Sequence, residues 1–150
     1  LPFVRRQYQA RIDFFADKVV FLRSRVQFST FNHGGKTTLG YLIAQDANFD
    51  LGKVRLSTRF SLFQTDDFDN RQYLYEKDVL YVFSIPFFSG GPGFRNYYVL
   101  QLKPHKKIDI WVKYAFTKYK GDVKSIGSGL EEIQGNKRSD LRIQLRYKFK

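Results

Sequence analysis

The C-terminal end of the sequence alternates apolar and polar side chains without interruption. From 141 to 149 every odd position is apolar and every even position is polar or cationic: Leu141, Ile143, Leu145, Tyr147 and Phe149 against Arg142, Gln144, Arg146 and Lys148. A period of two places the two sets on opposite faces of an extended chain, whereas a helix would mix them on every face. The stretch is therefore predicted to be a two-faced β-strand.

The same period recurs along the chain and predicts eight strands. They are residues 7–14, 20–29, 37–45, 53–62, 72–84, 96–103, 108–117 and 141–149, and the alternation is less regular in 72–84. Turn-forming clusters such as Asn32-His33-Gly34-Gly35 separate them, and no segment has a helical period with caps. The 150 residues thus predict one all-β domain, an antiparallel up-and-down transmembrane β-barrel or the C-terminal part of a larger one.

Alternation alone leaves open which face meets water. A soluble, lipocalin-like barrel that binds an apolar ligand keeps its apolar face inside, whereas an outer-membrane barrel turns that face toward lipid. The 26 Lys and Arg against 14 Asp and Glu also fit a soluble basic β-domain that binds nucleic acid, a reading we favour less. Several strands alternate over about 9–11 residues, the length that crosses a bilayer, and this favours the membrane.

Aromatic residues support the membrane reading. Amphipathic rings suit a membrane–water boundary. The aromatic residues near predicted strand ends are expected to form a girdle: Tyr73, Tyr75, Tyr97, Tyr98, Trp111 and Tyr119. The apolar face also consists of large residues on nearly every strand, which would compete for room inside a narrow barrel.

Three stretches resemble known outer-membrane proteins. The row Leu141–Phe149 resembles the C-terminal signal strand that the assembly machinery of bacterial outer-membrane barrels reads, except that Lys150 follows the Phe. The stretches Thr65–Pro86 and Ile126–Gly135 resemble the C-terminal region of Bacteroidetes outer-membrane proteins that carry ComEA-like helix-hairpin-helix repeats further upstream.

This resemblance spans roughly residues 50–150. It implies a bacterial outer-membrane location and a chain that is the tail of a longer protein. It also implies three kinds of partner: membrane lipid, the outer-membrane assembly machinery and other chains of a membrane complex. The repeats themselves are absent from these residues, so their DNA binding does not transfer.

Charge defines the other face of the predicted strands. If the apolar face meets lipid, the lumen receives eight basic residues: Arg11, Arg23, Arg25, Arg55, Arg59, Lys113, Arg142 and Arg146. Asp13 and Asp109 are the clearest inward acids. Because unpaired buried charge is costly, the lumen is either water-filled, within a barrel wider than eight strands, or receives acids from Asp66, Asp67, Asp69, Glu131 and Glu132. We expect the first arrangement.

The strand order also predicts a topology. With the C-terminus in the periplasm, the connection 120–137 is extracellular and 103–107 is a short periplasmic turn, as is usual for such barrels. The connection 65–70 would then lie on the periplasmic side, where its length is unexpected.

No motif points to catalysis or to a bound group. His33-Gly-Gly-Lys36-Thr37-Thr38 has Thr30 where a phosphate-binding loop needs its first Gly. His33 and His105 each stand alone, and Asp66, Asp67 and Asp69 lack the spacing of a calcium loop. Glu131 and Glu132 are adjacent and would point apart in an extended chain. We therefore expect no enzyme, no metal and no cofactor, but a structural, pore or transport protein with a cationic lumen that prefers anions.

Overall fold

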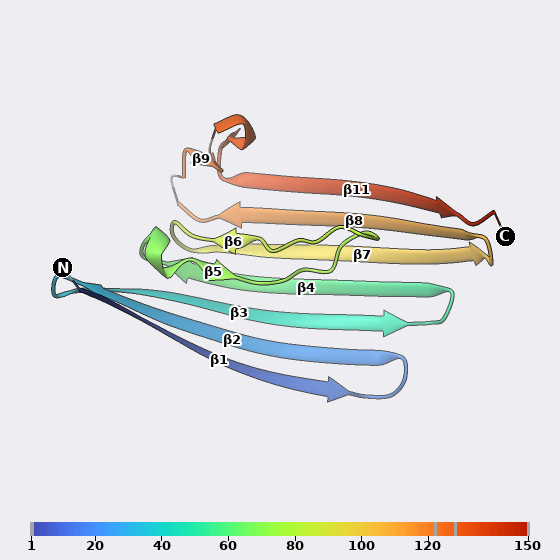
Figure 1. Ribbon diagram of the computed structural model, residues 1–150, viewed down its shortest axis with the longest axis horizontal. Coiled ribbons are helices and arrows are strands. Elements are labelled where there is room, and N and C mark those ends of the chain that lie inside the picture. The colour runs from blue at the N-terminus through green and yellow to red at the C-terminus, as the bar shows by residue number, and fades with distance from the viewer. Residues whose placement is uncertain (1, 122, 128, 150) are drawn as a thin grey trace.

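The computed structural model describes residues 2–121, 123–127 and 129–149 and has one large antiparallel sheet (Figure 1). Its seven strands follow the order of the sequence: β1 (Phe3–Phe15), β2 (Val20–His33), β3 (Lys36–Asp50), β4 (Val54–Thr65), β7 (Gly93–His105), β8 (Ile108–Tyr119) and β11 (Lys137–Tyr147). The connections carry short elements only: η1 (Phe68–Asn70), β5 (Gln72–Tyr73), β6 (Phe87–Phe88), β9 (Ser125–Ile126), η2 (Gly129–Glu131) and β10 (Ile133–Gln134).

The prediction of an all-β antiparallel fold is confirmed, but the sheet is not closed into a barrel. Among the described residues, β1 and β11 each pair on one side only. The predicted strand 72–84 is also wrong, because this stretch contributes only β5 and one isolated bridge, Glu76 to Ser84. The alternation of buried and exposed residues is present, since Gln72, Leu74 and Glu76 are buried between exposed neighbours. These buried residues pack against the face of the sheet, however, and the segment does not pair as one of its strands.

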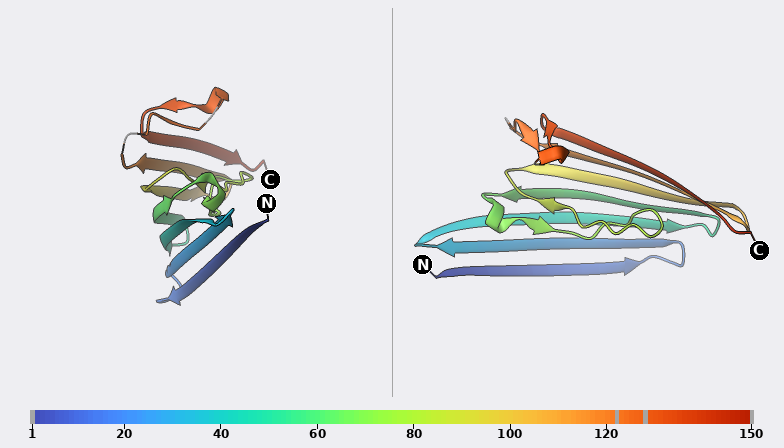
Figure 2. Two further views of the ribbon diagram at one scale, coloured as in Figure 1. Left: turned by 90° about the vertical axis from the view of Figure 1, so that its left-hand side faces the viewer. Right: turned by 45° about the horizontal axis from the view of Figure 1, so that its top comes forward.

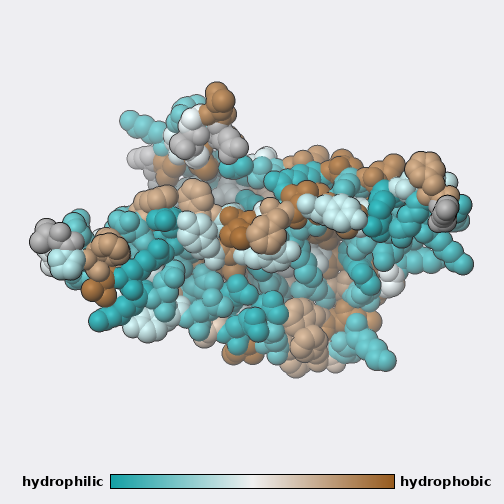
Figure 3. Space-filling model, viewed as in Figure 1, coloured by the Kyte–Doolittle hydropathy of each residue, from teal (hydrophilic) through white to brown (hydrophobic). Residues whose placement is uncertain are grey.

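Residues 66–92, here called the cover segment, lie against one face of the sheet (Figure 2). This covered face carries the polar row of each strand, including Arg59 of β4, Arg95 of β7 and Lys113 of β8. In the view onto the cover segment, hydrophilic residues dominate, and hydrophobic residues show along the rims and in patches across the middle (Figure 3). The opposite face, here called the uncovered face, carries the apolar row of each strand.

The strands are staggered by one residue on average for each step across the sheet, and most of the slide occurs at the steps to β4 and β3. From Arg142 at the centre of β11, the register leads through Lys113, Val99, Ser57, Asn48 and Phe21 to Phe15. The centre of β1 is Gln9, so the slide is six residues (15 − 9) over the six strand pairs. With about 3.3 Å per residue and about 4.8 Å between strands, this stagger corresponds to a strand tilt of about 35°. That tilt lies at the lower end of the range of about 35–45° found in β-barrels.

Both long connections leave the sheet at the same end, which also has one two-residue turn. The end where β11 finishes has the connections 16–19, 51–53 and 106–107, and the other end has 34–35, 66–92 and 120–136 (Figure 1). The predicted conflict at 65–70 therefore disappears. Because 72–84 is not a strand of the large sheet, residues 65–70 begin a single long connection that leaves the sheet at the same end as 120–136.

Candidate functional site: the cover segment and the polar face

The cover segment begins with close backbone contact to β3. A Cβ added to Gly40 would lie 2.5 Å from the carbonyl oxygen of Asn70, so only glycine allows this approach. The Ser29 hydroxyl donates to Asn70 Oδ1 at 2.9 Å, and Gln72 Nε2 donates to the Ser29 Oγ at 2.8 Å. These side chains are fully buried, and their mutual hydrogen bonds offset the cost of removing them from water.

Asp67 fixes the turn that precedes these contacts. Its carboxylate accepts hydrogen bonds from the backbone and side-chain nitrogens of Asn70 at 3.0 and 3.1 Å. Burial alone would raise the pKa of Asp67, but these hydrogen bonds and one from the Thr38 hydroxyl outweigh it and hold the pKa below its ordinary value.

A small apolar cluster holds the two arms of the cover segment to the sheet. Leu74 and Phe88 pack with Leu42, Phe63 and Tyr119, all nearly inaccessible to solvent. The Phe63 ring lies 4.7 Å from the Phe88 ring and 5.3 Å from the Tyr119 ring, measured between centroids. The core of the described molecule is thus on the polar face.

Buried ion pairs then join the cover segment to β7, β8 and β11. Glu76 is 1% exposed and accepts hydrogen bonds from Arg95 Nε at 2.6 Å and Arg95 Nη2 at 2.9 Å. Lys113 Nζ lies 3.3 Å from Glu76 Oε2 and 2.7 Å from Asp78 Oδ2, and Arg142 also contacts Asp78. Three cations from three strands therefore meet two acids from one connection.

A second network lies one strand away. Arg59 pairs with Asp46 of β3, its Nη2 donates to Asp46 Oδ2 at 2.8 Å, and its Nη1 donates to the Tyr75 carbonyl oxygen at 2.6 Å. The Tyr97 ring lies 5.4 Å from the Arg59 guanidinium carbon and 5.3 Å from Lys113 Nζ, within cation–π range. The cover segment thus supplies hydrogen-bond acceptors and ion-pair partners for basic residues that the sheet alone leaves incompletely paired.

The eight basic residues predicted for the lumen all lie on the polar face, but most are paired. Besides the pairs above, Arg23 and Arg11 lie 2.8 and 3.5 Å from Asp13, Arg55 lies 2.8 Å from Asp50, and Arg146 lies 2.6 Å from Asp109. Within the described residues Arg25 forms no ion pair, and its buried Nε has no hydrogen-bond acceptor.

The acids that pair with these basic residues come from two sources. Asp13, Asp46, Asp50 and Asp109 lie on the strands of the sheet, whereas Glu76 and Asp78 lie in the cover segment, where the sequence predicts a strand. Of the predicted loop acids, Asp66 accepts a hydrogen bond from the Leu39 backbone and Asp67 stabilises its own turn. Neither these two nor Asp69 and Glu132 pair with the basic set in the described structure, and the Glu131 side chain lies outside the described part.

The predicted aromatic girdle does not form one band. Tyr97, Trp111 and Tyr119 are buried on the covered face, and Tyr73 and Tyr75 are exposed on the cover segment. Only Tyr98 lies on the uncovered face. The sequence indicated the position of Trp111. It occupies an odd-numbered position of the same strand as Asp109 and Lys113, so the three side chains share one face.

The terminal row is placed as the alternation predicts. Leu141, Ile143, Leu145 and Tyr147 share the uncovered face with their apolar neighbours on β8, and all are exposed. Phe149 follows the end of β11 and is 88% exposed. Their reading as an assembly signal stays a prediction.

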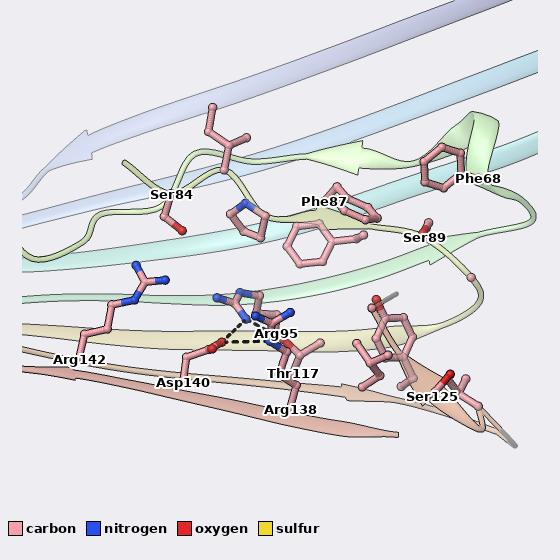
Figure 4. Close-up of a pocket in the computed structure, with 18 of the residues that line it drawn as sticks. Phe68, Ser84, Phe87, Ser89, Arg95, Thr117, Ser125, Arg138, Asp140 and Arg142 are labelled. Carbon is pink, nitrogen blue, oxygen red and sulfur yellow. Dashed lines mark hydrogen bonds and ion pairs between the residues drawn. The ribbon is translucent and has the colours of Figure 1, made fainter. Parts of the chain in front are cut away.

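A cavity of about 670 Å³ lies between the returning arm of the cover segment and the end of the sheet near the long connections (Figure 4). Arg95, Thr117, Arg138, Asp140 and Arg142 line its sheet side, and the hydroxyls of Ser84, Ser89 and Ser125 line other walls. Arg138 Nε lies 3.5 Å from Asp140 and Arg95 Nη1 lies 3.9 Å from it. Arg95 and Arg142 also pair with Glu76 and Asp78, so the described lining combines neutralised ion pairs and hydroxyls with apolar side chains such as Phe87 and Ile126.

The described residues contain no group of three or more His, Cys, Asp and Glu that would hold a metal ion. They also contain no helix that is long and apolar enough to span a membrane. No family model matches the chain, and no curated protein or solved structure matches it.

Proposed function

We propose that these residues form part of the wall of an integral outer-membrane β-barrel whose uncovered face meets lipid. The observation that carries this proposal is the continuous apolar character of that face across all seven strands. Its exposed large side chains are Val4, Tyr8, Ile12, Phe14, Val26, Phe28, Leu39, Tyr41, Ile43, Val54, Phe60, Leu62, Tyr98, Tyr114, Leu141, Ile143, Leu145 and Tyr147.

Charge is confined to one margin of this face. On the paired strands its charged side chains are Arg6, Lys118 and Lys137, all toward the end where the long connections lie. Basic residues are tolerated near a membrane boundary and are costly at its centre, by about 2–4 kcal/mol each at the midplane of a barrel wall. The distribution fits a lipid-facing surface whose outer boundary passes close to these three residues.

Energetics disfavour the soluble alternative. Keeping a Val, Leu, Ile or Phe side chain in water forfeits roughly 1.5–3 kcal/mol relative to burial. A soluble barrel would recover this by turning the apolar face inward, but here the inward space is taken by the cover segment and its ion pairs. Strand lengths of 11–15 residues also meet the requirement of about 9–11 residues for a tilted crossing.

The role that follows is a pore or a transport function with a cationic lumen partly filled by the cover segment. The cavity beside Arg138 and Arg142 is the proposed entry for solutes, and the surplus of basic over acidic residues on the covered face favours anions. The same reasoning supports lipid and the outer-membrane assembly machinery as partners. It supplies no group for catalysis and no cofactor.

Lipid contact can be tested with tryptophan fluorescence, because the single tryptophan, Trp111, is buried on the covered face. We expect brominated lipids to quench it weakly. In a double variant, Trp111→Phe with Tyr114→Trp, the only indole lies three residues further along β8 on the uncovered face, and we expect strong quenching. Equal quenching in both proteins, or a monodisperse monomer in plain buffer, would refute the proposal.

The pore role needs a separate measurement. We expect the membrane-inserted protein to conduct in planar bilayers with a reversal potential that shows anion preference. Cation preference, or the absence of conductance from protein that passes the quenching test, would exclude an anion pore while leaving the membrane location intact.

A further inference from the structure

The two edge strands of the sheet, β1 and β11, have unpaired backbone hydrogen-bonding groups on their outer sides in the described structure. A strand paired on one side directs roughly half of its backbone N–H and C=O groups toward the unpaired side. For β1 with 13 residues and β11 with 11, that leaves several donors and acceptors along each edge. Hydrocarbon offers no water to satisfy these groups, so leaving them unpaired there is strongly unfavourable. If the proposed function holds, on which this inference rests, both edges must be paired.

Strand direction excludes the simplest partners. Because the sheet is antiparallel and has seven strands, β1 and β11 run in the same direction (Figure 1). They cannot pair antiparallel with each other. A ring of identical copies would also join β11 to the next β1 in parallel, since rotation about the barrel axis preserves direction. Two β1 edges can pair antiparallel only if one copy is inverted in the membrane.

The cover segment sets a minimum size for the closed barrel. The interior of a barrel of about eight strands is just wide enough for its own side chains. Here the interior must also hold 27 residues of connection, 66–92, which already bury Leu74, Glu76 and Phe88 against the sheet. A closed wall with an even number of strands therefore needs more than eight.

We propose that an odd number of further antiparallel strands, three or more, closes this sheet between β11 and β1. We infer that they belong to a segment of the same polypeptide outside residues 1–150. Every neighbouring pair in the present sheet is also consecutive among its strands in the chain. Continuing that order at either end of the chain, and closing the ring, places such strands beside both β1 and β11.

Charge complementarity adds a property of these strands. The cover segment neutralises basic residues on β7, β8 and β11, whereas Arg5 and Arg25 on the β1–β2 side form no ion pair among the described residues. The buried Nε atoms of Arg5 and Arg25 have no acceptor among the described residues. Arg11 and Arg25 are also direct cross-strand partners, an unfavourable arrangement of like charges. The strand beside β1 is therefore expected to direct Asp or Glu inward.

Photo-cross-linking of the full polypeptide in its native membrane tests this proposal. The 150 residues contain no cysteine, so a single Gln9→Cys variant carries a benzophenone maleimide on the inward face of β1 without competing sites in this part. We expect the β1 probe to cross-link to a peptide outside residues 1–150 of the same molecule. A cross-link to β11, in the same or a second copy, or to a different protein, would overturn the proposal.

Two matched variants make the outcome specific. A Ser57→Cys probe on the central strand β4 should cross-link to the cover segment, since Lys77 Nζ donates to the Ser57 hydroxyl at 3.1 Å, and this reports correct folding. An Ile143→Cys probe on the uncovered face should cross-link to lipid if the proposed function is right. Loss of the lipid product alone refutes the membrane location, and a wrong peptide at the β1 probe refutes the closure.

Discussion

Replacing Glu76 by Gln tests whether the buried ion pairs hold the cover segment on the sheet. The Glu76 carboxylate receives two hydrogen bonds from Arg95 and lies 3.3 Å from Lys113 Nζ. The substitution keeps the shape of the side chain but removes its charge. Among the described residues, Arg95 then keeps the Thr117 hydroxyl as a hydrogen-bond partner, and its only acid is the distant Asp140, at 3.9 Å. Breaking one partner of a buried pair costs about 3–5 kcal/mol.

That cost should appear as easier local opening of the cover segment. Because about 1.4 kcal/mol changes an equilibrium tenfold, a loss of about 3–5 kcal/mol raises the open population by a factor of roughly 10² to 10³ or more, up to the limit set by global unfolding. Hydrogen exchange measures this at the Glu76 amide, which donates to the Ser84 carbonyl oxygen at 2.9 Å. We expect its exchange, and that of the Leu74 amide, to accelerate by that factor while central amides of β3 change little.

Two comparisons make the result decisive. Glu132→Gln removes a similar charge from an exposed residue and should leave exchange unchanged. Adding Arg95→Gln to Glu76→Gln removes the stranded cation and should recover part of the loss. If Glu76→Gln alters exchange in 66–92 by less than about threefold, the ion pairs do not hold the segment and our account of the polar face is incorrect.

Three further predictions concern single contacts. Gly40→Ala places a methyl group 2.5 Å from the Asn70 carbonyl oxygen, so we expect a loss of about 1–3 kcal/mol and faster proteolysis after Arg71; unchanged proteolysis would contradict the close contact. The lowered pKa of Asp67 means that its contribution to stability is present above the pKa of the unfolded chain and is lost as pH falls through the folded pKa; an Asp67→Asn variant should therefore lose this part of the acid sensitivity measured by hydrogen exchange at Asn70. Arg59→Gln strands the buried Asp46 and should lower the free energy of unfolding in detergent by about 3–5 kcal/mol, whereas Arg25→Gln removes a cation without an ion pair and should leave it unchanged or raise it; equal losses would show that Arg25 has a partner of comparable strength.

The strand pattern accounts for much of the fold. Period-two alternation located the seven long strands and assigned residues such as Arg59 and Phe60 to opposite faces, because the side-chain period of a strand is independent of its neighbours. The same pattern placed all eight predicted basic residues on one face. The odd-numbered position of Trp111 on β8 also indicated that its side chain lies on the covered face. The prediction of a girdle relied instead on how close the residue lies to a strand end.

The alternation does not determine which segment each extended segment pairs with. Apolar and polar residues alternate in 72–84 much as they do in a strand of the sheet. Only the tertiary structure shows that Gln72, Leu74 and Glu76 pack against the covered face of the sheet. Alternation records that an extended chain has a buried and an exposed side, but it does not record whether the backbone hydrogen bonds go to a neighbouring strand. The ion pairs of Glu76 and Asp78, the open edges and the directions of β1 and β11 all follow from that choice. Only the tertiary structure decides which segments pair, because this pairing depends on contacts between residues far apart in the chain.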